Sequence, residues 1–258
     1  MLYLQANVLK LMFMDRTKLF EEFLEECKKN HQICGAGNPY AHILLVGQEH
    51  RSDKPIESEK EWQDYLDKNY RYCETNNPWI ITDENSNLWR KYQNSTPTWS
   101  SYQRLIEKAL TERKKRVLQG DKDFEFDAFT TELNNEAKPS SRVKGKEERE
   151  KLRERIEARL KLFKHSDYIK SFPVIILACG GYIRNDKIVR DIDDTFHVTF
   201  SKRYDYSTGN WFCTHYDDMD PKRLVIHTRQ LSNGVSYKMI DYMASIIRDH
   251  LDHLKNLD

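Results

Sequence analysis

Three short stretches of this chain are almost continuously apolar, and polar residues follow each of them. They are HILLVG at residues 42–47, VIILACGG at 174–181 and LVIH at 224–227. Apolar runs without alternation are typical of strands buried on both faces, as in parallel sheets. A fourth strand is expected within GDKDFEFDAFTTELNN at 120–135. These four segments constrain the fold more than any other feature.

Amphipathic segments with helical spacing separate the apolar runs. Strands that alternate with helices predict an α/β fold in three layers, α/β/α, around a mostly parallel four-stranded sheet. The segment 197–216 alternates around a turn at residues 207–210, which predicts an added β-hairpin. The expected helices cover residues 15–30, 57–69, 98 to about 118, 144–164 and 235–254.

The chain reads as one domain over residues 14–258. The apolar N-terminal stretch is interrupted by Gln5, Asn7 and Lys10 and has no small-residue cleavage site after it. It is too short and too polar for a membrane span. Met14 precedes the amphipathic helix and is a more natural start, so residues 1–13 are expected to be a non-native or disordered extension.

Charge and cysteine content narrow the classes of function. The 42 basic and 41 acidic residues nearly cancel, so any nucleic-acid contact requires a local basic patch. The five cysteines include no C-x-x-C pair, which argues against a disulfide framework and an iron–sulfur cluster. No two His or Cys have metal-ligand spacing. We therefore expect a cytoplasmic protein without metal, cofactor or membrane contact.

Polar side chains gather where three of the predicted strands end. Gly47-Gln48-Glu49-His50 follows the first strand, Asn134 ends the second, and His227 begins a polar segment that reaches Ser232. In a parallel sheet these ends lie at one edge, where α/β proteins bind their ligands. The sequence therefore predicts one polar site there.

The order of these motifs resembles the uracil-DNA glycosylase superfamily. HILLVGQEH stands in place of that family's strand ending in a Gly-Gln-Asp-Pro-Tyr type motif, and TTELNNE is the nearest match to its base-reading Asn. VIILACGG matches its hydrophobic run ending in glycine, and IHTRQLS matches its His-Pro-Ser type loop. The resemblance spans about residues 38–250 and depends on motif order.

The resemblance implies an enzyme that hydrolyses the N-glycosidic bond of a flipped, damaged or modified base in single- or double-stranded DNA. It implies that His227 stabilises the departing base anion, and that Gln48 or Glu49 orients or activates the attacking water. The implied substrate-binding residues are Gly47 and His50 at the pocket, Asn134 for reading the base, Trp79 or else Trp89 for stacking, and Arg229 and Ser232 for the flanking phosphates.

The motifs also depart from the family pattern. Glu49 replaces an Asp, His50-Arg51 replaces Pro-Tyr, Thr228 replaces a Pro, and Arg229 stands where a small residue is expected. The alternative is therefore a non-catalytic module that binds nucleic acid or a nucleotide on the same fold. A different hydrolase or transferase using Glu49 and His227 is a third hypothesis; the chain has no G-x-S-x-G elbow and no P-loop.

Two further segments mix features of nucleic-acid binders with those of ordinary surfaces. The helix at 142–164 is strongly basic, although such helices are usually solvated through i,i+4 ion pairs. The hairpin combines basic and aromatic residues as single-strand binders do, and the same residues also suit an exposed hairpin. They are Lys202, Arg203, Tyr204, Tyr206 and Trp211.

Overall fold

A seven-stranded mixed sheet forms the centre of the fold. The computed structural model describes residues 2–51, 56, 58–74, 97–110, 123–138, 145–217 and 222–256. The sheet order is β1-β3-β2-β4-β7-β6-β5. Its strands are β1 (Ala36–Gly37), β2 (Ile43–Arg51), β3 (Ala128–Lys138), β4 (Val174–Leu177), β5 (Thr199–Ser207), β6 (Asn210–Tyr216) and β7 (Leu224–Thr228).

The expected α/β class is confirmed, but the sheet is larger than the four-stranded one that the sequence predicts. The four predicted strand segments form neighbouring strands β3, β2, β4 and β7, which pair in parallel. β1, β5 and β6 extend this centre on both sides, and all of them pair antiparallel. β5 and β6 are the expected hairpin. β1 has only two residues, which is too short to show a periodicity.

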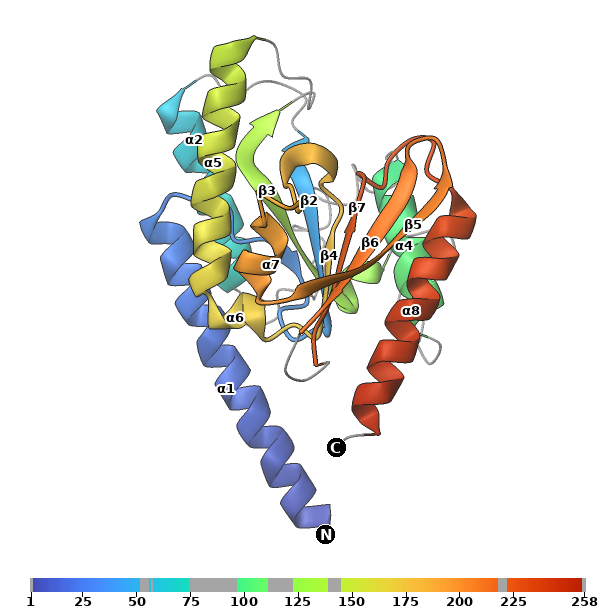
Figure 1. Ribbon diagram of the computed structural model, residues 1–258. Helices are drawn as coiled ribbons and strands as arrows, with labels where there is room; N and C mark the ends of the chain where they lie inside the picture. Colours follow the sequence, from blue (N-terminus) through green and yellow to red (C-terminus); the bar gives the residue numbers. More distant parts are fainter. Residues whose placement is uncertain are drawn as a thin grey trace.

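Helices cover both faces of the sheet (Figure 1). On the first face, α1 (Leu2–Lys29), α2 (Glu59–Glu74), α5 (Lys146–His165), α6 (Asp167–Lys170) and α7 (Asp191–Phe196) pack on one apolar cluster. On the second face, α4 (Pro97–Ala109) and α8 (Tyr237–Lys255) pack on the other. Within β2, Leu44 and Val46 face the first cluster, whereas Ile43 and Leu45 face the second. Burial on both faces explains the unbroken apolar runs.

Three helices differ from their expected bounds. α2 ends at Glu74, five residues beyond its expected end at 69. α1 begins at Leu2 and continues without interruption through Asp15, so it starts well before the expected helix. α4 ends at Ala109, short of the expected end near Leu118; residues 111–122 lie outside the described part. α5 and α8 lie close to the ranges expected from their apolar spacing.

A fully buried arginine, Arg159 of α5, joins this helix to the sheet. Its Nε donates to the Glu132 carbonyl at 3.0 Å, and its Nη2 donates to Thr131 Oγ1 at 2.6 Å. Its Nη1 donates to Gln32 Oε1 at 3.0 Å, and the guanidinium lies over the Phe163 ring. Oxygen acceptors therefore surround this cation, although none of the described carboxylates forms an ion pair with it.

Candidate functional site

The carboxyl ends of β2, β3, β4 and β7 lie at one edge of the sheet, as their parallel pairing requires. Glu49 of β2 is the register partner of Asn134 of β3, and His227 of β7 is the partner of Leu177 of β4. The structure thus brings together the ends of the strands that carry the predicted catalytic residues and Asn134.

Gln48 and His227 both reach the turn that follows β4. Gln48 Nε2 donates to the Cys179 carbonyl at 3.1 Å, and His227 Nε2 lies 2.9 Å from the carbonyl oxygen of Gly180, the next residue. Gly180 has φ +55°, and a Cβ there would lie 3.6 Å from Gln48 Nε2. The turn is therefore held between side chains from the two strands that flank β4.

The imidazole of His227 is neutral at physiological pH. Burial lowers its pKa to about 4, although the bond to Gly180 opposes this shift. Because a carbonyl oxygen can only accept, Nε2 carries the proton and donates, which leaves Nδ1 as an acceptor. The Trp211 ring of β6 lies edge-on to the imidazole, with centroids 5.0 Å apart. Sequence reasoning placed Trp211 on the hairpin but did not connect it with His227.

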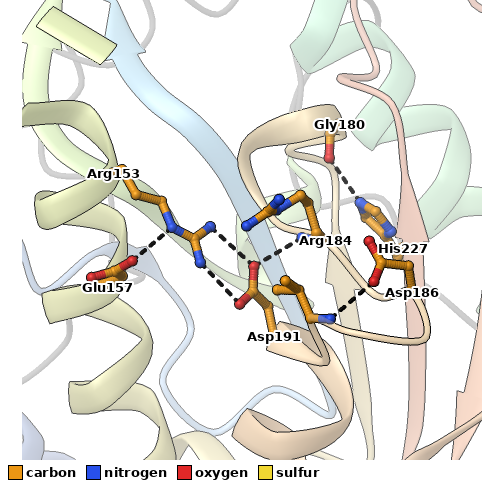
Figure 2. A network of polar contacts seen from close by, with 8 residues as sticks. Arg153, Glu157, Gly180, Arg184, Asp186, Asp191 and His227 are labelled. Carbon is orange, nitrogen blue, oxygen red and sulfur yellow. Dashed lines mark hydrogen bonds and ion pairs between the residues drawn. The ribbon is translucent and has the colours of Figure 1, made fainter. Parts of the chain in front are cut away.

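The segment from the end of β4 to the first residue of α7, residues 178–191, is held at several points (Figure 2). Asp186 Oδ1 accepts from the backbone N–H groups of Ile188 and Val189, which closes a tight turn. At its far end Asp191 accepts from the backbone N–H of Arg184 at 2.9 Å and pairs with Arg153 of α5 at 3.2 Å. We call residues 178–191 the β4–α7 loop. Its fixed ends define one boundary of the candidate site.

Glu49 is bound by a side chain from this loop. The Tyr182 hydroxyl donates a short hydrogen bond to Glu49 Oε2. Burial, followed by this bond to Glu49, raises the pKa of Tyr182 and keeps its phenol protonated. Glu49 is thus positioned by a donor that sequence reasoning missed. The signal for Tyr182 was its place directly after the apolar run of β4.

A second carboxyl group, that of Glu132, lies beside the predicted site residues. Gly47 and Glu132 are register partners, and a Cβ on Gly47 would lie 2.9 Å from Glu132 Cδ and closer still to Oε2. Oε2 is shielded from solvent and has no hydrogen-bond partner in the described part of the chain. Burial, and then the charge of Glu49, raise the pKa of Glu132 to about 8, against the opposing influence of Arg159. Glu132 is therefore mostly protonated at neutral pH.

Asn134 is fully buried within β3, which does not end there as expected but continues to Lys138. Its Oδ1 accepts from Arg155 Nε at 3.0 Å and from the Glu136 backbone N–H at 3.3 Å. Its Nδ2 has no hydrogen-bond partner among the described residues. Arg155 also pairs with Glu136 at 2.7 Å. The carboxamide of Asn134 is therefore fixed in one orientation, with an unused amide donor.

Of the remaining predicted substrate-binding residues, two lie in the loop after β7. Both terminal nitrogens of Arg229 donate to carbonyl oxygens, those of Gly209 and Asn233, at 3.2 Å each. Ser232 is half-buried in the same loop, after β7. The side chain of His50 and all of Trp79 lie outside the described residues.

The site residues offer proton donors and acceptors. No group of three or more His, Cys, Asp or Glu in the described ranges is arranged to hold a metal ion. None of the described helices is long and apolar enough to cross a membrane. The site combines a carboxyl group held by a phenol, a protonated carboxyl group, a neutral imidazole and two carboxamides. These groups can carry out acid–base chemistry or bind a polar, hydrogen-bonding ligand.

Comparison of the chain with known proteins gives no matching family model, no similar curated protein and no similar solved structure.

Proposed function

We propose that this protein hydrolyses the N-glycosidic bond of a flipped, damaged or modified base in DNA. One observation carries the proposal: strand ends that are distant in the chain place Gln48, Glu49, Asn134 and His227 at one sheet edge. β2, β3, β4 and β7 follow one another in the motif order of the uracil-DNA glycosylase superfamily. The proposal therefore includes a uracil-DNA glycosylase-like fold with added strands.

In the proposed reaction, water attacks C1′ of the sugar and Glu49 accepts a proton from it. The electron pair of the C1′–N bond leaves with the base, which gains negative charge. The Nε2–H of His227 then donates to a base oxygen, which stabilises that charge. The unused amide of Asn134 donates to the base edge. Binding must release His227 from Gly180.

The thiols fit the cytoplasmic setting that the proposal assigns. All five cysteines are free and buried. Free thiols persist in a reducing compartment. DNA repair inside the cell is the process that such an activity would serve.

The test is release of free base from oligonucleotides that carry uracil, hypoxanthine, xanthine or methylated bases. We expect release by the wild-type protein and a loss of about 10²–10³-fold for His227→Ala. Glu49→Gln should also slow release. His250→Ala is the matched control, because His250 is another buried histidine but belongs to α8 on the second face. Absence of release from every substrate by folded protein would refute the proposal for those bases.

A second candidate, a module that binds nucleic acid or a nucleotide without cleaving it, is favoured by a specific observation. Gln48 and His227 are both bonded to the β4–α7 loop, and Glu49 is bonded to Tyr182. Side chains whose hydrogen bonds are satisfied within the protein need no catalytic role to explain them. Saturable binding of DNA with no base release would support this candidate.

A further inference from the structure

Exposed aromatic side chains gather where the β5–β6 hairpin meets α8. Tyr206 is 38% exposed and Tyr242 is 42% exposed. The Tyr206 and Tyr242 ring centroids are 6.2 Å apart, and Tyr204 lies 5.4 Å from Tyr242. We call Lys202, Tyr204, Tyr206, Lys238 and Tyr242 the hairpin surface.

The tyrosine rings rest on a rigid base. Phe212 of β6 is fully buried and stacks under Tyr204, with centroids 4.5 Å apart, and under Tyr206, with centroids 6.3 Å apart. Side chains held in this way lose little conformational entropy when a planar ligand stacks on them. The exposed rings are therefore prepared for stacking.

The charge around these rings is positive. Residues 199–210 and 229–242 contain Lys202, Arg203, Arg229 and Lys238, with Asp205 and Asp241 as their only acidic residues. Asp205 pairs with Arg203 and Asp241 pairs with Arg104. No ion pair to another described residue compensates Lys202, Arg229 or Lys238. The chain as a whole has a net charge of only +1, so this region is a local basic patch.

The hairpin surface is continuous with the candidate site. Arg229, just after β7, donates to the carbonyl of Gly209 in the hairpin turn. Asn210 donates to the Gly234 carbonyl at 3.2 Å and accepts from the Ser236 backbone N–H at 2.8 Å. The turn, the loop after β7 and the start of α8 therefore form one unit. Figure 1 shows the turn and the start of α8 at the edge where β7 ends.

The β5 edge itself is poorly suited to pairing with a strand of another protein. β5 carries Lys202, Arg203 and Asp205, and its pairing with β6 is irregular between Phe200 and Lys202 and again between Asp205 and Ser207. Charged residues and bulges are features that prevent edge-to-edge pairing. The exposed rings and uncompensated cations therefore favour a ligand that stacks and carries negative charge.

We propose that the hairpin surface binds single-stranded DNA, with bases stacked on Tyr206 and Tyr242 and phosphates beside Lys202 and Lys238. The proposal rests on the proposed function for its choice of nucleic acid, and it adds the strand state of the substrate. Aromatic rings accept bases of any sequence, but only bases that are not already stacked in a duplex. In this proposal, the DNA strand bound across the hairpin surface continues toward His227.

The test is fluorescence anisotropy of a labelled oligothymidylate of about 12 nucleotides, a length within the range that single-strand binding folds cover. We expect the wild-type protein to bind it at least about tenfold more tightly than a duplex. The logarithm of the binding constant should fall with the logarithm of salt concentration with a slope near about −1.4, as two phosphate contacts predict. Tyr206→Ala/Tyr242→Ala should weaken binding about tenfold or more without changing this slope.

Two further variants test the phosphate contacts and provide a control. Lys202→Gln/Lys238→Gln should make the salt slope shallower by about 1.4. Phe200→Ala is the control, because Phe200 is an exposed aromatic of the same strand whose ring packs on His215 on the first face. Its binding should stay within about twofold of wild type. Unaltered binding by the tyrosine variant would overturn the proposal. So would concentration-dependent dimerisation that the tyrosine substitutions abolish, since the surface would then bind a second copy.

The two measurements, base release and single-strand binding, distinguish failure of the glycosylase proposal from failure of the hairpin-surface proposal. Tight single-strand binding without base release would refute the glycosylase and retain the hairpin surface. Base release with no tyrosine-dependent binding would refute the hairpin surface alone.

Discussion

The carboxyl group of Glu132 occupies the space that a side chain at Gly47 would need. Gly47→Ala should therefore force the two strands or the carboxyl group to move, at a cost of about 1–3 kcal/mol in unfolding free energy. Urea denaturation measures this cost.

The control and the rescue follow from the same geometry. Gly181→Ala should be close to neutral, because a Cβ on Gly181 meets nothing within 4 Å. Removing the Glu132 side chain as Glu132→Ala should make the added methyl at position 47 nearly neutral in that background. If the two substitutions are additive, Glu132 is not what excludes a side chain at position 47.

The raised pKa of Glu132 predicts a pH dependence of stability. The carboxyl group has a pKa of about 8 in the folded protein and a reference value of 4.5. Between these values the folded state keeps a proton that the unfolded chain releases, so raising the pH favours unfolding. The contribution of protonated Glu132 to the unfolding free energy is complete below about pH 4.5. It decreases by up to about 1.4 kcal/mol per pH unit as the pH rises, and the decrease ends above about pH 8.

The variant Glu132→Gln removes the titrating group while keeping the shape of the side chain. Its unfolding free energy, compared with wild type at pH 5, 6, 7 and 8, should lack this decline. Tyr65, Tyr102, Cys179, Glu49 and Arg159 also interact with Glu132 electrostatically, and all remain in the variant. Parallel curves for the two proteins would show that Glu132 does not titrate in this range.

The buried guanidinium of Arg159 should be intolerant of substitution. Arg159→Met leaves three buried acceptors without their donor, including the Glu132 carbonyl and Gln32 Oε1. Arg159→Lys keeps the charge but loses the planar fork that reaches acceptors in several directions. Each should lower stability by about 3 kcal/mol or more. Arg149→Met, on the exposed side of the same helix, should change it by less than about 0.5 kcal/mol.

The β4–α7 loop should open more readily when either of its side-chain contacts is removed. Gln48→Ala and His227→Ala each delete one hydrogen bond to the loop, worth about 1 kcal/mol. Hydrogen exchange at Tyr182 and Asp186, whose amides are bonded within the loop, should accelerate about fivefold. Gln63→Ala, on α2, removes a similar glutamine bond and should leave these amides unchanged. Unchanged exchange in the Gln48 and His227 variants would contradict the proposed anchoring.

The strand ends could be predicted because burial on both faces leaves a pattern in the sequence. The apolar runs reveal Gln48, Glu49 and His227, whereas the expected second strand and the motif order reveal Asn134. Parallel pairing brings these strands together at one edge. The resemblance in motif order stays a prediction.

What could not be predicted depends on register and on contacts between distant segments. Glu132 was visible within its strand, but only the pairing of β2 with β3 places it opposite Gly47. Trp211 approaches His227 because β6 pairs with β7, which local spacing does not encode. Neither interaction leaves a periodic signal, so composition and spacing could not reveal either one.

The division of the sheet into two covered faces has a consequence during synthesis. β2 and β4 present Ile43, Leu45 and Ile176 to the face that α4 and α8 cover, and α8 follows every strand in the chain. A nascent chain that has completed all its strands still exposes much of this apolar surface. Ribosome-bound intermediates that stop before Tyr237 should therefore be the ones that molecular chaperones recognise most strongly.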